Sequence, residues 1–377
     1  MKKIYGITIV KNESDIIESF FRYNLTYCDG ILVYEGKKST DNTAWIIRKL
    51  IEEGLPIHSV DELADPQSLT TIKSYDDLRK AMAMRAISAF NADLIIPLDA
   101  DEFLYHTDGF NPRETLEGLQ ENVEYRVPWR TYVYPGEAEN NQVFLPNRFT
   151  HYRNPLFETL NKVLISRYLI EEMEISFVPG CHHVLYPGER FRRLPVEAPS
   201  GLVYAHFPLR SKHQLMKKVI INRIHKWKIQ TVYQKEKGFQ LSGIFDELKN
   251  NGDISQENIL HHSMKYSVRD EHFYEIQENV GEKILIKEPM NLSFCADKLS
   301  LCYTDTCEDE KALIKGMLTE IDSTINHLID SRYSSETIGA LSRQLEEIYN
   351  TRTWKAGTVI KRIYRFFIKF HASDSSG

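Results

Sequence analysis

Two aspartates one residue apart follow an apolar stretch near the end of the first quarter of the chain. The stretch is Leu94-Ile95-Ile96-Pro97-Leu98, and it runs directly into Asp99-Ala100-Asp101-Glu102. Mg²⁺ and Mn²⁺ prefer carboxylate oxygens and complete their coordination with substrate phosphates and water. We therefore expect Asp99 and Asp101 to hold Mn²⁺ or Mg²⁺, which offsets the charge on a departing diphosphate. An acidic loop with helix-capping aspartates is the simpler alternative.

Imidazole, guanidinium and carboxylate groups later in the chain could complete such a site. His182 and His206 each follow a strand-like run, and we expect one of them to face the metal or the diphosphate, with His182 assigned to the metal. Arg210 opens a basic helix and is expected to donate to the diphosphate. A carboxylate that takes a proton from an attacking hydroxyl could be Glu158 or Glu102.

Apolar runs that alternate with helically spaced apolar residues must position these groups. The expected strands are residues 4–10, 31–34, 56–60 and 92–98, and the expected helices lie near 16–25, 45–50 and 76–90. This alternation predicts a mostly parallel sheet with right-handed crossovers and helices on both faces. Ligands bind at the carboxyl ends of such strands, so Lys11-Asn12-Glu13, the segment 35–43 and the aspartates should converge there.

Four segments, in this order, resemble the family 2 glycosyltransferases of GT-A fold. They are Val10-Lys11-Asn12-Glu13, Tyr34-Glu35 with Ser39-Thr40-Asp41-Asn42-Thr43, Leu98-Asp99-Ala100-Asp101-Glu102-Phe103, and Ala205-His206-Phe207-Pro208-Leu209-Arg210-Ser211. The third is similar to the DxDEF signature, and the fourth to the His-x-x-x-Arg-Ser element, of a branch related to family 92. The resemblance covers roughly residues 1–230.

The resemblance implies a nucleotide-sugar donor, with UDP as the nucleotide. It implies that Asn12, Glu13 and Glu35 line the nucleotide pocket, although many relatives have Asp in place of Glu35. Asp41 would fix the loop or cap the following helix. Asp99 would meet the ribose or the metal, and Asp101 the metal and the diphosphate.

Composition and pattern divide the chain into a catalytic region and a helical one. Residues 1–235 are expected to form the GT-A-like domain, with a nucleotide-binding half at 1–103 and an acceptor-side half at 104–235, followed by a mainly helical region at 236–377. Helices in that region could join two copies of the chain. The basic amphipathic segment 354–370 suits either an anionic membrane surface or core packing. Trp129, Tyr132 and Phe157 form either an acceptor-sugar platform or core.

The resemblance implies a hexosyltransferase-type enzyme of inverting mechanism, with a retaining mechanism left open. Together with the sequence patterns, it predicts a cytoplasmic enzyme, either free or peripheral at the inner face of the cell membrane. Its acceptor would be a saccharide, a lipid-linked sugar or a glycoprotein. The net charge of −6 argues against nucleic acid as a partner. Five cysteines without CxxC spacing fit reduced thiols.

Three alternatives share the paired aspartates. A haloacid-dehalogenase-type phosphatase needs a small residue where Phe103 stands, and a nucleotidyltransferase usually has a glycine-rich loop where Lys11-Asn12-Glu13 stands. A degenerate, non-catalytic sugar-binding module is the third alternative, which metal-dependent transfer would exclude.

Overall fold

The computed structural model describes part of the chain, which divides into two compact units. The described residues are 1–35, 39–60, 74–134, 144–158, 160–187, 194–212, 214–216, 218–219, 244, 254–268, 270–281 and 283–288. The first unit comprises Met1–Pro208 with Asp270–Thr306, and the second Leu209–Arg269 with Cys307–Gly377. The expected boundary at 235 and the basic segment 354–370 lie outside the described residues.

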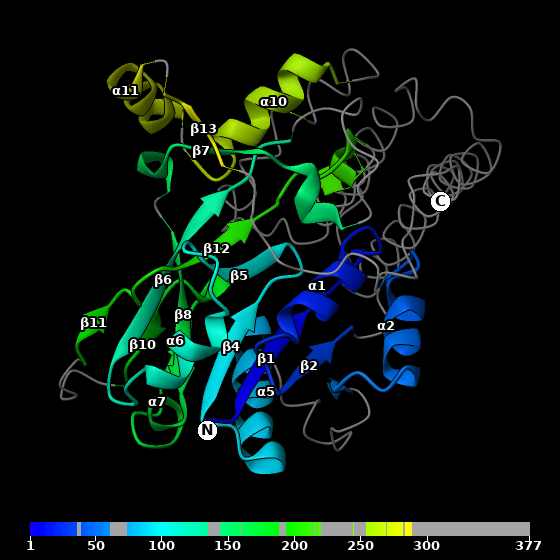
Figure 1. The fold of residues 1–377 in the computed structure, drawn as a ribbon, viewed down its shortest axis with the longest axis vertical. Helices are drawn as coiled ribbons and strands as arrows, with labels where there is room; N and C mark the ends of the chain where they lie inside the picture. Colours follow the sequence, from blue (N-terminus) through cyan, green and yellow to red (C-terminus); the bar gives the residue numbers. More distant parts are fainter. Residues whose placement is uncertain are drawn as a thin grey trace, which may run out of the picture. The chain divides into compact units, whose positions relative to one another are not determined.

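A mixed nine-stranded sheet forms the centre of the first unit, in the order β3-β2-β1-β4-β8-β6-β12-β5, with β11 paired to β6 (Figure 1). The strands are β1 (Ile4–Ile9), β2 (Gly30–Tyr34), β3 (Ile57–Ser59), β4 (Leu94–Leu98), β5 (Glu102–His106), β6 (Glu124–Thr131), β8 (Asn161–Ser166), β11 (Val196–Glu197) and β12 (Leu202–His206). β1 to β4 run parallel, β8 is antiparallel to β4 and β6, and β5 is antiparallel to β12. The expected α/β class with a mostly parallel central sheet is confirmed.

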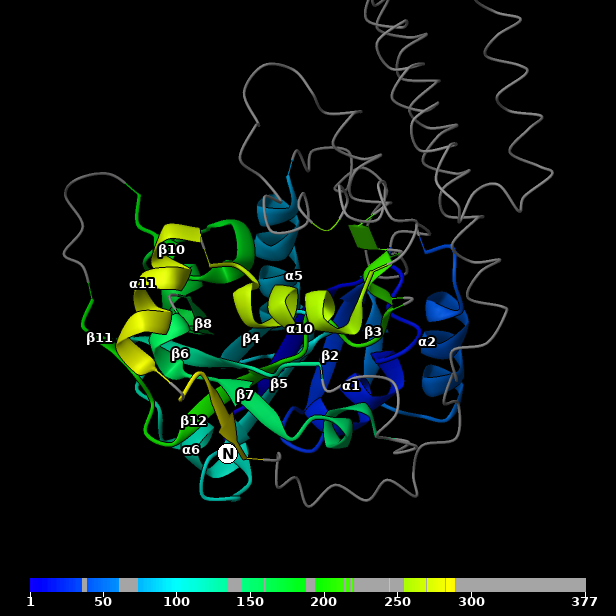
Figure 2. The same cartoon turned by 90° about the horizontal axis from the view of Figure 1, so that it is seen from above.

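Three helices connect the parallel strands. They are α1 (Ile17–Asn24), α2 (Thr43–Glu52) and α5 (Tyr75–Phe90), and Figure 2 shows α1 and α5 on opposite faces of the sheet. α5 begins where the Ser74 hydroxyl accepts a hydrogen bond from the Asp77 amide, and it ends where Asn91 adopts left-handed backbone angles. The helical spacing of its residues predicted this helix correctly, and the two caps fix its ends.

Smaller elements complete the described part of the chain. They are α6 (Pro112–Gly118), β7 (His151–Arg153), α7 (Arg167–Glu171), β9 (Ser176–Phe177), β10 (Val184–Leu185), α10 (Gln256–Lys265), α11 (Asp270–Val280) and β13 (Leu285–Lys287), with 3-10 turns at Leu145–Arg148, Pro155–Phe157 and Pro179–Cys181. α10 belongs to the second unit, and α11 and β13 belong to the first. No helix within the described ranges has the length and apolar character needed to cross a bilayer.

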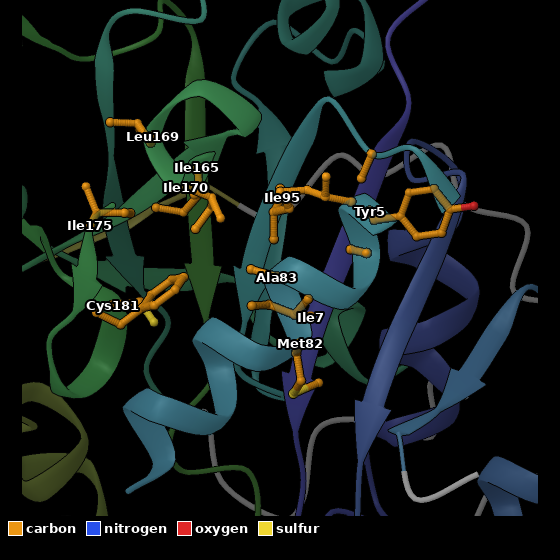
Figure 3. Packing of buried hydrophobic residues seen from close by; sticks show 14 of the residues in the cluster. Tyr5, Ile7, Met82, Ala83, Ile95, Ile165, Leu169, Ile170, Ile175 and Cys181 are labelled. Carbon is orange, nitrogen blue, oxygen red and sulfur yellow. The ribbon is translucent and has the colours of Figure 1, made fainter. Parts of the chain in front are cut away.

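Apolar side chains cover both faces of the sheet. On one face, Ile7, Ile95 and Ile165 from three neighbouring strands pack with Met82 and Ala83 of α5 (Figure 3). Burial on both faces accounts for the continuous apolar runs of β1 and β4, because neither strand has a face exposed to water.

An aromatic cluster is built around Phe103, the last residue of the DxDEF segment. Phe103 is fully buried, and its ring centroid lies 5.6 Å from that of Phe207, 6.0 Å from that of Phe144 and 6.4 Å from that of Phe20. This anchoring fixes the start of β5 and therefore the acidic turn that precedes it.

Candidate functional site

The carboxyl ends of β1, β2 and β4 lie side by side. Ile9 pairs with Tyr34, and Thr8 pairs with Leu98, so each of the three strands ends at the same edge of the sheet. The three polar clusters follow these ends, and the expected convergence is therefore present in the fold.

The loops after β1 and β2 are joined by hydrogen bonds. Asn12, which has a positive φ of 59°, donates its amide to the Ser39 hydroxyl (3.1 Å) and accepts from the Thr40 amide at Oδ1 (2.7 Å). The Ser39 amide in turn donates to Oε1 of Glu35 (2.6 Å). One oxygen each of Asn12 and Glu35 is thus committed to shaping this edge.

Asp41 joins the same two loops through both of its carboxylate oxygens. Oδ1 accepts from the amide and the hydroxyl of Thr43 (3.0 and 2.5 Å), and Oδ2 accepts from the Ser14 hydroxyl (3.0 Å). The Thr43 hydroxyl oxygen also accepts from the Glu13 amide (2.8 Å). Asp41 therefore fixes the conformation of the loop. The side chain of Glu13, in the neighbouring loop, is half-buried.

The acidic segment is a tight turn between β4 and β5. The Glu102 amide donates to the Asp99 carbonyl (3.0 Å), and the Asp99 amide donates to Oε2 of Glu102 (3.0 Å). Glu102 is fully buried, whereas the Asp99 side chain retains 37% of its exposure. The buried Glu102 side chain therefore stabilises the turn, whereas the Asp99 side chain is partly exposed to solvent.

A buried lysine lies against this turn. The ammonium of Lys162, at the start of β8, is 2.6 Å from Oδ2 of Asp99 and 3.1 Å from Oε2 of Glu102, and the side chain is 1% exposed. Lys162 reaches the acids because β8 runs antiparallel to β4, which brings the start of one strand beside the end of the other. Burial lowers the pKa of Lys162, but the two carboxylates outweigh it and the pKa is raised.

The surroundings of this turn shift the pKa values of Asp99 and Glu102 in opposite directions. Desolvation raises the pKa of Asp99, but the Lys162 ammonium and the Arg79 guanidinium, whose Nη2 is 3.7 Å from Oδ1, outweigh it and hold the pKa at about 2. Burial raises the pKa of Glu102 to about 8, against the attraction of Lys162. Within the described residues, Oε1 of Glu102 has no hydrogen-bond partner.

Asp101 lies near a histidine. Its Oδ2 lies 3.9 Å from Nε2 of His206, whose Nδ1 is 3.4 Å from the Thr131 hydroxyl. His206 pairs with Thr131 of β6 and with Glu102 of β5, and directly paired residues project from the same face of a sheet. The Trp129 ring lies 4.3 Å from the His206 ring and restricts its orientation.

Glu158 forms a buried ion pair with Arg153, next to Thr131. Arg153 donates to its two oxygens (2.9 and 2.7 Å), and the Thr131 amide donates to Oε1 (2.7 Å). Burial raises the pKa of Glu158, but the Arg153 guanidinium outweighs it, and the pKa lies below its usual range. A weakly basic, enclosed carboxylate is poorly suited to accept a proton, so the geometry favours a role in positioning Thr131.

His182 lies near Lys162 and packs against the protein backbone. Its Nδ1 donates to the Asn161 carbonyl (2.9 Å), which leaves the lone pair on Nε2, and burial lowers its pKa. A Cβ on Gly180, which has a φ of +80°, would collide with the imidazole at Nε2. Glycine at position 180 therefore leaves room for the imidazole, and the assignment of His182 to the metal stays a prediction.

The structure also describes two other groups from the sequence analysis. Trp129, Tyr132 and Phe157 are buried, at 7%, 0% and 0% exposure, so they form core and not an acceptor-sugar platform. Arg210 belongs to the second unit, where it is buried and its amide donates to Oε1 of Gln214 (3.3 Å).

Sequence reasoning missed Lys162, Arg79 and Arg153. The available signal for Lys162 was a charge at the start of an otherwise apolar strand, Asn161–Ser166. Lysine is almost never fully buried without a partner. Nothing local indicates which acid it meets, because Asp99 is 63 residues away along the chain.

The residues present fit a divalent cation held by two protein ligands. Neighbouring ligand atoms about 2.1 Å from an octahedral ion stand about 3.0 Å apart, so the 3.9 Å between Oδ2 of Asp101 and Nε2 of His206 would shorten by about 1 Å if both held one ion. Asp99 fits less well, since cations already face both of its oxygens. Among the described residues, no three His, Cys, Asp or Glu side chains are grouped to hold a metal by themselves.

Comparisons with known proteins give structural likenesses and no family. A scan against protein-family models and a search of curated proteins found no match. The structure is similar to the crystal structure of S. aureus TarS 1–349, with 12% identity over 70% of this chain and 80% of that chain, at a TM-score of 0.33. It is similar to mannose-1-phosphate geranyltransferase from Thermus thermophilus, with 11% identity over 65% and 67% of the two chains, at a TM-score of 0.25. Likenesses at these TM-scores assign no activity.

Proposed function

We propose that this protein is a metal-dependent glycosyltransferase with a GT-A-like catalytic unit. The observation that supports this most is the meeting of Asp99, Asp101 and His206 at the edge of the sheet where the loops after β1 and β2 also end. An anionic nucleotide-sugar needs both a cation for its diphosphate and a pocket for its nucleoside. The joined loops would line the nucleoside side of the donor, and the acidic turn would hold the cation.

Different residues would bind the metal ion and the nucleotide. Mn²⁺ or Mg²⁺, when bound, would neutralise the charge that develops on the departing nucleoside diphosphate. Asp101 and His206 would hold that ion, with Thr131 orienting the imidazole through Nδ1. Glu13 and the loop that Asp41 fixes would line the nucleotide side.

The donor, acceptor and stereochemistry complete the proposal. UDP is the proposed nucleotide, a saccharide, lipid-linked sugar or glycoprotein the acceptor, and inversion the outcome, in a cytoplasmic enzyme. Glu158 is bound by Arg153, and Glu102 is fully buried, so neither is proposed as the general base. The acceptor hydroxyl would give its proton to another group on the acceptor side.

A thermal-shift panel of nucleotide-sugars with and without Mn²⁺ tests the donor. A ligand that binds only the native state raises the melting temperature by mass action, so one nucleotide-sugar should raise it by several degrees with Mn²⁺ and by much less with EDTA. Hydrolysis or transfer of the same donor should then be detectable as released nucleoside diphosphate. A panel without any metal-dependent shift would contradict the proposal.

A further inference from the structure

We infer that Glu158 is a positioning residue that fixes which nitrogen of the His206 imidazole carries the proton, and that it acts through the Thr131 hydroxyl. The proton is held on Nδ1, and Nε2, on the side of Asp101, presents a lone pair. The use of this arrangement rests on the proposed metal site, whereas the position of the proton can be measured without any metal.

Glu158 can only accept hydrogen bonds at its position. Arg153 donates from Nε to Oε1 (2.9 Å) and from Nη2 to Oε2 (2.7 Å), and the Thr131 amide donates to Oε1 (2.7 Å). The Arg153 and Glu158 side chains are 2% and 5% exposed, so they form a desolvated ion pair. The guanidinium keeps the carboxylate ionised, and an ionised carboxylate has no proton to donate.

The Thr131 hydroxyl connects this carboxylate to the imidazole. Its oxygen lies 3.2 Å from Oε2 of Glu158 and 3.4 Å from Nδ1 of His206. A hydroxyl has one proton to donate, and a hydrogen bond to an ionised acceptor is stronger than one to a neutral acceptor. The hydroxyl therefore donates to Glu158, and its oxygen accepts from Nδ1–H of His206.

The imidazole is held in place for this contact. His206 is the cross-strand partner of Thr131, it is 4% exposed, and the Trp129 ring lies 4.3 Å from its ring. A neutral imidazole has one donor and one acceptor nitrogen, so a proton on Nδ1 leaves the acceptor at Nε2, 3.9 Å from Oδ2 of Asp101. A divalent cation binds a nitrogen in that state.

Nitrogen-15 NMR of the full-length protein with labelled histidine tests the inference without metal at about pH 8.5, where an ordinary imidazole is neutral. Protonated and unprotonated ring nitrogens resonate far apart, and His206→Gln identifies the His206 resonances by their loss. A free imidazole side chain in water carries its proton mainly on Nε2. His206 should instead show a protonated Nδ1 and an unprotonated Nε2, and either the Nε2–H form or the imidazolium would overturn the inference.

Two variants should move the proton to Nε2. In Glu158→Gln, the amide oxygen must face the two N–H donors at Oε1, so the NH₂ group points at the Thr131 hydroxyl, which then donates to Nδ1 of His206. Thr131→Val removes the hydroxyl, whereas Thr131→Ser keeps it and should keep the proton on Nδ1. A proton that stays on Nδ1 in either folded variant, Glu158→Gln or Thr131→Val, would overturn the inference.

Thr150→Val is the matched control, because the Thr150 hydroxyl lies 2.9 Å from Nδ1 of the neighbouring His151. It should change the His151 resonances and leave those of His206 as they are. Movement of the His206 proton in this control would show a general effect of losing a hydroxyl and would overturn the inference. Near-UV circular dichroism reports folding, and if neither test variant folds, the wild-type spectrum decides.

Adding Mn²⁺ alone separates the inference from the proposed function. Mn²⁺ should broaden the His206 resonances of the wild type, and it should bind Thr131→Val roughly 10–100-fold more weakly but Thr131→Ser about as well. The Nδ1–H form without broadening would uphold the inference and remove the metal from the proposed function. The Nε2–H form with broadening would overturn the inference and leave a metal-dependent transferase in place.

Discussion

At the scale of single residues, Asp101 and Glu158 show how similar acids acquire different tasks. Asp101 stands in the turn opposite an imidazole, whereas Glu158 is enclosed by a guanidinium and the backbone. Charge and hydrogen-bond partners, which the residue type alone does not specify, decide whether a carboxylate can bind a ligand or can only support its neighbours.

Replacing Asp101 by Asn should reduce sugar transfer by at least about a hundredfold, because even outer partners of a bound metal are worth roughly 10–100-fold. The side chain is 13% exposed at the mouth of a turn, so the melting temperature without ligand should change little. Steady-state transfer rates with a saturating donor check this. Near-normal transfer by the folded variant would remove the proposed role of the turn.

Glu158→Gln should destabilise the protein at neutral pH by about 3–5 kcal/mol, because it leaves the Arg153 guanidinium buried without its counter-charge. The pKa of Glu158 is lower in the folded than in the unfolded protein, so its stabilisation is present above the usual pKa of about 4.5 and is lost as pH falls through the lower folded value. The difference in unfolding free energy between the two proteins should therefore narrow below about pH 4.5.

Urea titrations between pH 3 and pH 7 measure this difference. Glu197→Gln changes an exposed acid on β11 and is the control, with an expected effect within about 0.5 kcal/mol at each pH. A difference for Glu158→Gln that stays constant across this range would contradict the ion-pair account.

At the scale of elements, the loops after β1 and β2 behave as one unit because Asp41 bridges them. Asp41→Ala removes the acceptor for the Thr43 amide and the Ser14 hydroxyl and should cost about 1–3 kcal/mol. It should also weaken donor binding, since the loops line the proposed nucleotide pocket. Urea unfolding and donor titration measure the two effects.

The neighbouring Asn42 provides a matched control for that variant. Asn42 precedes α2, and its side chain makes no capping hydrogen bond, so Asn42→Ala should cost less than about 1 kcal/mol. Equal costs for the two variants would show that the bridge contributes little.

At the scale of the first unit, a late segment forms a separate two-stranded sheet with an earlier strand. β13 pairs with β7, and Glu288, directly after β13, accepts from Arg130 (2.6 Å) and from the Tyr152 hydroxyl (3.2 Å). The Arg130 guanidinium also lies over the Tyr152 ring at 4.9 Å. Residues more than 150 positions apart in the chain thereby form one structural unit.

Arg130→Met should weaken the attachment of β13 to β7 without affecting the rest of the first unit. Hydrogen exchange of the β13 amides should accelerate up to about fivefold, since partly exposed ion pairs are worth roughly 1 kcal/mol or less. Exchange in β1 and β4 should not change. Arg126→Met is the control, because Arg126 pairs with Glu124 of its own strand. Unchanged exchange in β13 would show that the backbone pairing holds the segment without the ion pair.

The sequence by itself determined the parallel half of the sheet and the place of the acidic turn. Strands β1, β2 and β4 and helices α1 and α5 follow from local apolar periodicity, which can be read along a short window. Strands β5 and β12 were not expected as a pair, because their register joins Glu102 to His206 across more than a hundred residues.

Only the tertiary structure decided what each acid of the turn can do. The antiparallel entry of β8 places Lys162 against Asp99 and Glu102, and the pairing of β12 between β5 and β6 places His206 opposite Asp101. Ionisation and metal affinity depend on charges within a few ångströms, and those charges come from distant parts of the chain. The sequence predicted a site at this edge of the sheet, and strand pairing decides which charged groups each of its residues meets.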